Sequence, residues 1–281
     1  EFGTPAAAAV FAIEVTVVGI AHYSAIVPCL LSSLTAAMVA DWFHVKPTSF
    51  LVRYIPEFHA DSYFMLARTI IMGIAGAIVS IVFCKIMSKT AELYKKYIKN
   101  PYLRILAGGA IVAAISMLIY ALTGSFDYNG AGTDIIKKAF IGQSRPEAFI
   151  LKMLLTALTL GCGFKGGEIV PSLYIGATFG CFFGGLLGLS HSFGAAVGLA
   201  AVFCGVTNCP FATLLLTIEL FGADGLPYYA LVIGISYMLS GYTGLYSAQK
   251  FYDNKFIHRR FRHLKTYKEI KADSAANNGK D

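Results

Sequence analysis

The sequence predicts an all-α protein that crosses a membrane several times, and composition, segment length and segment spacing support this. Of its 281 residues, 56% are hydrophobic and 14% are charged, and the mean hydropathy is +0.63. A typical soluble domain has about 25% charged residues. Apolar runs of about 17 to 25 residues, the length that spans a bilayer as a helix, recur along the chain. We therefore expect a polytopic bundle of membrane helices.

Several of the apolar segments are too short to cross about 30 Å of hydrocarbon, so short or broken helices are expected among the long ones. Between two of them, the polar stretch from Ser125 to Thr133 predicts a loop, and Asp134 is expected to cap a short amphipathic helix that runs to about Gln143. Residues 272–281 have a composition typical of disorder. The apolar segments are residues 5–21, 22–42, 63–87, 103–123, 147–162, 169–189, 193–206, 210–222 and 226–243.

The net charge of +7 is concentrated in two places. Residues 250–281 contain nine Lys or Arg and four Asp or Glu, which gives +5 in that tail. Because basic flanks stay in the cytosol, the C-terminus is expected to be cytoplasmic, in the plasma (inner) membrane. Both basic stretches read as solvated loops, with no nucleic-acid partner. The second is expected to be a loop on the same side, with Lys85, Lys89, Lys95, Lys96, Lys99 and Arg104.

Neither cysteine nor histidine spacing indicates a metal, a cofactor or a disulfide framework. The histidines at 22, 44, 59, 191, 258 and 263 have no ligand spacing, and no motif for an enzyme is present. A membrane-embedded enzyme with Cys162 or Cys204 as nucleophile is the rival class, but neither has a base nearby in sequence. The remaining cysteines lie in apolar segments and read as small buried hydrophobes: Cys29, Cys84, Cys181 and Cys209.

An internal repeat becomes visible when Pro5 is aligned with Pro210. Each proline opens a short apolar segment, and nine residues later comes a carboxylate, Glu14 in one copy and Glu219 in the other. Matching interrupted helices in two halves indicate a transporter with its site at the repeat interface near the middle of the membrane. Carboxylates inside a membrane are functional candidates by default.

The segment Gly166-Gly-Glu-Ile-Val-Pro171 places an ionisable residue between paired glycines and a proline, at the start of an apolar helix. Glycine permits a sharp turn, and proline suits the first helical turn. The main-chain N–H groups of Glu168 and Ile169 are then expected to point out of the helix start, which is a natural anion site. Alternatively, Glu168 caps its own helix or pairs with Lys165, itself read as an interfacial, snorkelling lysine.

These residues also carry a family resemblance. Residues 161–180 resemble the Gly-x-Phe-x-Pro region of CLC chloride channels and transporters. Other matches follow in family order and reach about residue 255. Phe2-Gly-Thr-Pro-Ala-Ala resembles the family's Phe-Asn-Ala-Pro-Leu-Ala helix, and Thr207-Asn-Cys-Pro-Phe-Ala resembles the counterpart of that helix in the second half. Tyr128-Asn-Gly-x-Gly resembles a middle loop, and Gly244-Leu-Tyr-Ser resembles the Pro-Leu-Tyr-Ser start of the last helix.

The resemblance implies a CLC-like inverted-repeat bundle of which this chain is a fragment. Residues 1–60 would be the end of the first repeat, 61–255 the second repeat with the anion-site loop, and 256–281 a basic cytoplasmic tail. The family's Gly-Ser-Gly-x-Pro loop and its Gly-Lys/Arg-Glu-Gly-Pro loop, with the gating glutamate, do not occur in the sequence. The chain is thus expected to begin in the middle of a longer protein whose N-terminal half completes the site.

Carried over by position, the resemblance implies an anion held by the main chain of Glu168 and Ile169 and by the hydroxyl of Tyr246, with Gly166 and Gly167 letting the backbone approach the ion. In family transporters the internal proton glutamate would fall on Val15, so Glu14 is read as a helix-end or water-facing group.

A glutamate at position 168 resembles the fluoride-exporting, proton-coupled branch of the family. A protonated carboxyl group can donate a strong hydrogen bond to fluoride and carry the proton. The match is incomplete, because Val170 stands where that branch would have threonine. We therefore expect proton-coupled fluoride export, with a chloride channel or chloride/proton exchange as the alternative. A packing fragment without transport is a third possibility. The implied partners are a halide, a proton, the bilayer and a second copy that pairs through residues 5–42 and 210–240.

Overall fold

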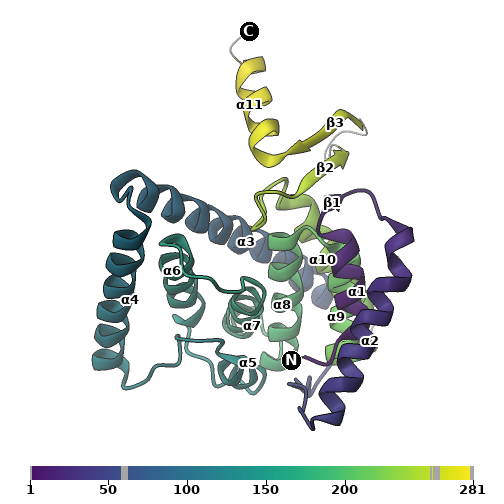
Figure 1. Cartoon of the computed structure of the whole chain (residues 1–281). Helices are drawn as coiled ribbons and strands as arrows, with labels where there is room; N and C mark the ends of the chain where they lie inside the picture. Colours follow the sequence, from purple (N-terminus) through teal and green to yellow (C-terminus); the bar gives the residue numbers. More distant parts are fainter. Residues whose placement is uncertain (1, 58–62, 254, 256–259, 279–281) are drawn as a thin grey trace.

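The computed structural model describes residues 2–57, 63–253, 255 and 260–278, and in this part of the chain it is mostly helical (Figure 1). The prediction of an all-α bundle with short and long helices is confirmed. The elements are α1 (Pro5–Glu14), β1 (Val17–Val18), η1 (Tyr23–Ala25), α2 (Ile26–Trp42), α3 (Tyr63–Tyr97), α4 (Pro101–Thr123), α5 (Thr133–Phe140), α6 (Ala148–Gly161), α7 (Ile169–Leu186), α8 (His191–Thr207), α9 (Pro210–Phe221), α10 (Leu226–Leu239), β2 (Lys250–Asp253), β3 (Arg260–Thr266) and α11 (Tyr267–Asn278).

Among the described residues, four helical segments are long and apolar enough to cross a membrane. They comprise η1 with α2, then α3, α4 and α7. Helices α1, α6, α8, α9 and α10 are apolar but have at most 17 residues. Figure 1 shows α7 and α8 in the middle, α4 along one edge, and α1, α2 and α9 on the opposite side. Helix α3 runs from the end next to α4 across the molecule towards α8 and α10.

Several predicted boundaries were wrong. Helix α3 continues to Tyr97, so most of the predicted basic loop is the last part of this helix. The first apolar segment stops being helical at Glu14 and continues into β1. Gly132 rather than Asp134 precedes α5, because its left-handed φ of 73° ends the loop one residue earlier, and α5 ends at Phe140.

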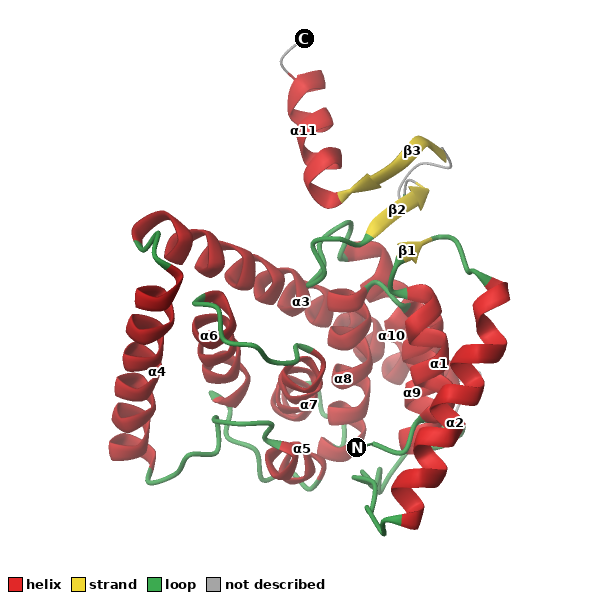
Figure 2. Ribbon diagram, in the orientation of Figure 1, coloured by secondary structure: helices red, strands yellow, loops and turns green. Residues whose placement is uncertain are grey.

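The C-terminal tail is more ordered than its composition predicts. Strand β2 pairs in parallel with β1 and antiparallel with β3, which gives a small sheet order of β1-β2-β3 (Figure 2). Residues 272–278, predicted to be disordered, lie in α11, while 279–281 fall outside the described residues. At the start of α11 the Glu269 carboxylate accepts hydrogen bonds from the main-chain N–H and the hydroxyl of Thr266, which favours a helix there.

The centre of the bundle is the close pair α7 and α8, which meet through glycines. A Cβ at Gly180 would lie 2.2 Å from the carbonyl oxygen of Gly194, and a Cβ at Gly198 would lie 2.5 Å from the Cα of Gly180. A side chain at either position would collide with the facing helix, so only glycine fits there. Small residues let membrane helices pack through their backbones. Nearly every residue of α8 is buried, so α8 forms the core against which α7 packs.

Helices α1 and α9 pack together and cap each other reciprocally. The Glu14 carboxylate at the end of α1 accepts hydrogen bonds from the N–H groups of Phe211 and Ala212 in the first turn of α9. The Glu219 carboxylate in the last turn of α9 accepts those of Ala6 and Ala7 in the first turn of α1. Glu14 is thus a helix-end group, as expected, and the two proline-to-glutamate segments are related by an antiparallel pairing, as an inverted repeat requires.

Candidate anion site

Helix α7 begins directly after the glycine-rich segment, and its start carries free main-chain donors. The N–H groups of Glu168 and Ile169 donate no hydrogen bond to any residue that the structure describes, while the carbonyl of Glu168 accepts the helical bond from Ser172. Pro171 is the third residue of the helix. Unpaired N–H groups and the positive end of the helix dipole both favour an anion at this point.

The turn before α7 depends on a different glycine from those predicted. Gly163 has a φ of 116°, whereas Gly166 and Gly167 have no positive φ. A Cβ at Gly167 would meet nothing within 4 Å, so the main chain is open to its surroundings there. Gly167 therefore leaves space beside the helix start, whereas a Cβ at Gly166 would lie 2.8 Å from the side chain of Leu160. Gly163 turns the chain.

The Glu168 side chain is half-buried and acts neither as a helix cap nor as an ion-pair partner of Lys165 within the described residues. Its charge acts on the thiol of Cys84 in α3 and on the phenol of Tyr246. The carboxyl group forms no hydrogen bond with a residue that the structure describes, so it is available for a proton or an ion.

Tyr246 lies in the turn between α10 and β2, where the resemblance implied the start of a helix. Its ring packs edge-on against Phe11 of α1, with 6.3 Å between the ring centroids. Its hydroxyl group forms no hydrogen bond with any residue in the described part of the chain. The phenol is thus a hydrogen-bond donor that no described residue uses.

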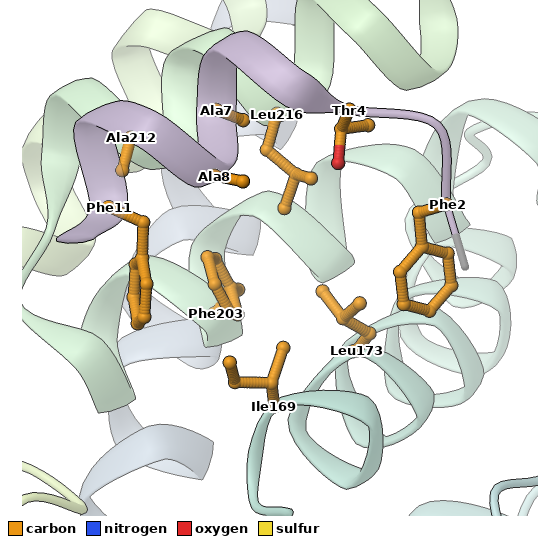
Figure 3. A pocket seen from close by; sticks show the side chains of 10 residues that line it. All are labelled: Phe2, Thr4, Ala7, Ala8, Phe11, Ile169, Leu173, Phe203, Ala212 and Leu216. Carbon is orange, nitrogen blue, oxygen red and sulfur yellow. The ribbon is translucent and has the colours of Figure 1, made fainter. Parts of the chain in front are cut away.

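Phe11 connects this tyrosine to a small apolar cavity of about 180 Å³ above the start of α7 (Figure 3). Figure 3 shows the side chain of Ile169 pointing into this space, opposite Phe203. Thr4 has the one hydroxyl group among the residues that line it. The lining residues come from α7, α8, the α1/α9 pair and the segment that precedes α1: Phe2, Thr4, Ala7, Ala8, Phe11, Ile169, Leu173, Phe203, Ala212 and Leu216.

A second, more polar cavity of about 650 Å³ is lined by Gly166, Gly167 and Pro171. Lys152 from α6 also lines it, although only 2% of this residue is exposed. Its ammonium group donates to the carbonyls of Tyr128 and Gly130 and lies 4.9 Å from the centre of the Tyr174 ring. Sequence reasoning missed Lys152, although it is the one cation within the apolar segment 147–162.

The structure also shows the surroundings of the two cysteines named in the rival enzyme hypothesis. Cys162 and Cys204 are both buried, and their thiols donate to the carbonyl oxygens of Thr159 and Ile233. Within the described residues, no three His, Cys, Asp or Glu side chains gather at a position where they could hold a metal ion.

Comparison with known proteins places these features in a family. The family model described as voltage gated chloride channel matches residues 1–241. A chloride/fluoride channel protein of Pseudomonas syringae pv. tomato is 34% identical over 255 residues, which are 89% of this chain and 55% of the relative. An H(+)/Cl(-) exchange transporter of Vibrio cholerae is 24% identical over 237 residues, 78% of this chain and 48% of the relative.

Solved structures share the fold. The crystal structure of a CLC-type fluoride/proton antiporter aligns with a TM-score of 0.81 and 30% identity, over 89% of this chain and 62% of that one. A slow cyanobacterial Cl-/H+ antiporter aligns with a TM-score of 0.69 and 20% identity, over 85% and 57%. The chain spans about half the length of the curated relatives that it matches. It is an integral membrane protein and belongs to the voltage gated chloride channel family, the CLC family.

Proposed function

We propose that this chain forms the C-terminal part of a CLC-type halide/proton transporter and supplies half of its anion site. The observation that carries the proposal is the start of α7, where the N–H groups of Glu168 and Ile169 have no hydrogen-bond partner among the described residues. A membrane protein satisfies nearly all its main-chain groups internally, because no water is available in the hydrocarbon. Unpaired donors at a helix start within the bundle therefore call for a ligand, and an anion is the ligand that they suit.

The tyrosine completes the donor set. The free phenol of Tyr246 can donate a third hydrogen bond without adding an opposite charge. Neutral donors bind an ion firmly enough to remove its water shell, yet weakly enough to release it, which transport requires. Lys152 adds positive charge near Gly166 and Gly167 and would draw anions towards the same loop.

Fluoride is the halide that we favour, because the donor set contains Glu168. In its protonated form the carboxyl group can donate a short hydrogen bond to fluoride. The same group would release this proton and take up another as the ion passes. The relative with 34% identity is called a chloride/fluoride channel protein, and the solved structure with 30% identity is a fluoride/proton antiporter. These names support fluoride but belong to other proteins.

Chloride is the second candidate. Among the relatives is an H(+)/Cl(-) exchange transporter, and Val170 departs from the threonine of the fluoride branch. A channel mode without proton coupling belongs to the same alternative.

The other partners are also proposals. We expect an N-terminal half to supply the gating glutamate and the remaining loops around the anion, and a second copy to pair through residues 5–42 and 210–240. In the plasma (inner) membrane the C-terminus would face the cytosol. The α3–α4 turn with its basic residues and the C-terminal segment emerge at the same end of the molecule (Figure 1), which supports a common side for both.

The test is halide efflux from liposomes that contain the protein together with its upstream half. Fluoride and chloride efflux are measured with ion-selective electrodes and proton movement with a pH-sensitive dye. Fluoride efflux that drives protons in the opposite direction supports the proposal. Efflux of neither halide would refute it, and chloride efflux alone would transfer it to the chloride alternative.

The role of Glu168 is tested with Glu168→Gln, which keeps the shape but cannot cycle a proton. We expect proton coupling to fall at least about tenfold, as for the loss of a general acid or base. Glu92→Gln is the matched control, because Glu92 is an exposed carboxylate on α3. Unchanged coupling in Glu168→Gln would contradict the assigned role, and an equal loss in the control would show that the effect is not specific.

A further inference from the structure

The turn that carries Tyr246 is neither helix nor strand, so something other than a regular hydrogen-bond ladder must fix its shape. Two main-chain bonds attach it to other elements. The N–H of Leu245 donates to the carbonyl of Val206 in α8 at 3.0 Å, and that of Lys250 donates to Thr16 at 3.2 Å. The remaining attachments come from side chains.

Gln249 lies three residues after Tyr246 and is 3% exposed. Its Nε2 donates to the carbonyl oxygens of Val15 and Thr207, at 3.0 and 2.8 Å. Its Oε1 accepts a bond of 3.1 Å from Asn208. One side chain thus joins the end of α1, the end of α8 and the tyrosine turn.

Asn208 holds the other side of the turn. It is fully buried, has a left-handed φ of 58° after the end of α8, and its Nδ2 donates to the carbonyl of Thr243 at 2.9 Å as well as to Gln249. A Cβ at Gly244 would lie 2.9 Å from this amide nitrogen, so a residue without a side chain is needed there. Tyr246 is therefore held from both flanks, through Thr243 before it and Gln249 after it.

Lys255 completes the network from the C-terminal segment. Its Nζ donates to Oδ1 of Asn208 at 2.6 Å and to the carbonyl of Tyr237 at 2.9 Å, and lies 3.9 Å from the centre of the Tyr237 ring. The ammonium thus meets the carboxyl ends of α8 and α10, where the helix dipoles favour a cation. The amide groups of Asn208 and Gln249 then have every N–H and each oxygen in use, and a fully satisfied buried network is rigid.

We propose that Gln249 and Asn208, anchored by Lys255, are positioning residues that aim the Tyr246 phenol at the anion. The inference rests on the proposed function, because the phenol is assigned to the anion there. None of the three touches the ion in this scheme, and each acts through the shape of the turn. Residues that only stabilise the fold would instead affect transport whether or not the phenol is present.

The test is a double-variant cycle in the protein with its upstream half, reconstituted in liposomes, with the KM for fluoride as readout. Tyr246→Phe removes the hydroxyl and keeps the ring. Gln249→Met keeps approximate volume and removes all three hydrogen bonds of the amide. We expect Gln249→Met to raise KM about fivefold, comparable to the loss of one hydrogen bond to the ion, with little change in the maximal rate. In the Tyr246→Phe background the same change should raise KM less than about 1.5-fold, because the two residues act as one unit.

Equal effects of Gln249→Met in both backgrounds would overturn the inference, and so would no effect in either. If Tyr246→Phe itself leaves the KM unchanged while fluoride is transported, the assignment of the phenol to the anion fails, and this failure is separate. Should Gln249→Met not elute from size exclusion like the unmodified protein, Lys255→Met takes its place in the same cycle. We expect a smaller rise in KM, about twofold, since this change removes the bonds of the ammonium group to Asn208 and Tyr237 but leaves the three bonds of the Gln249 amide in place. The same rise in the Tyr246→Phe background would then overturn the proposal.

Discussion

The reciprocal caps of α1 and α9 give the sharpest prediction about stability. Glu14 accepts hydrogen bonds of 3.2 and 2.8 Å from Phe211 and Ala212, and Glu219 accepts bonds of 3.0 and 2.8 Å from Ala6 and Ala7. Replacing either glutamate by alanine leaves two N–H groups without an acceptor. Little water reaches this helix pair to replace the lost carboxylate as acceptor.

The magnitude follows from these bonds. A hydrogen bond to a charged group contributes about 1.5 to 3 kcal/mol, and we take the low end for both caps because each contains one longer bond, of 3.2 Å to Phe211 and of 3.0 Å to Ala6. Glu14→Ala or Glu219→Ala should therefore lower the free energy of unfolding by about 3 kcal/mol, as two bonds at that value. For a domain of this size the melting temperature would fall by about 6 to 12 °C. Because both caps hold the same helix pair, the double variant should lose less than the sum, by about 1 kcal/mol.

Thermal unfolding of the detergent-purified protein, followed by size exclusion after heating, measures these shifts. Glu92→Ala is the control, since Glu92 is exposed on α3 and its loss should change the melting temperature by less than about 2 °C. If Glu14→Ala and Glu219→Ala both melt with the control, apolar packing alone holds α1 on α9 and the reasoning is refuted. If the losses in unfolding free energy from the two changes are strictly additive, the two caps are not coupled, although each cap still stabilises the helix pair.

Two further predictions concern helix packing and the C-terminal segment. Gly180→Ala should lower the melting temperature of the detergent-purified protein by at least about 5 °C, because the new Cβ would lie 2.2 Å from the Gly194 oxygen. Gly234→Ala in α10, where a Cβ meets nothing within 4 Å, is the control and should leave the melting temperature unchanged. Equal melting temperatures of the two variants would contradict backbone packing of α7 on α8. Burial lowers the pKa of Lys255 from its usual 10.5 to about 7, so the folded protein holds fewer protons than the unfolded chain between these values and becomes more stable as the pH rises across that window. Comparing melting temperatures at pH 7 and pH 9 should show a gain that Lys255→Met lacks, and an identical pH response of the variant would contradict the lowered pKa.

The sequence by itself determined the class of the protein and the chemistry of its donors. Composition and run length predicted the membrane helices, because the bilayer sets both. The proline-to-glutamate repeat of residues 5–14 and 210–219 predicted matching helices, since local sequence fixes where a helix starts and ends. The Gly-Gly-Glu-Ile-Val-Pro segment similarly predicted a helix start with free N–H groups at Glu168 and Ile169, because the first N–H groups of any helix lack an internal partner.

Only the tertiary structure decided which residues meet. That Glu14 caps α9 and Glu219 caps α1 depends on an antiparallel packing between segments about 200 residues apart in the sequence. The turn of Tyr246 was predicted as a helix start, but contacts with Gln249, Asn208 and Lys255 hold it in another shape. The pairing of β2 with β1, which sets Lys250 opposite Val17, likewise joins segments more than 200 residues apart in the sequence. A polar side chain in an apolar segment indicates only that it needs a hydrogen-bond partner. Which residue is that partner depends on the tertiary structure.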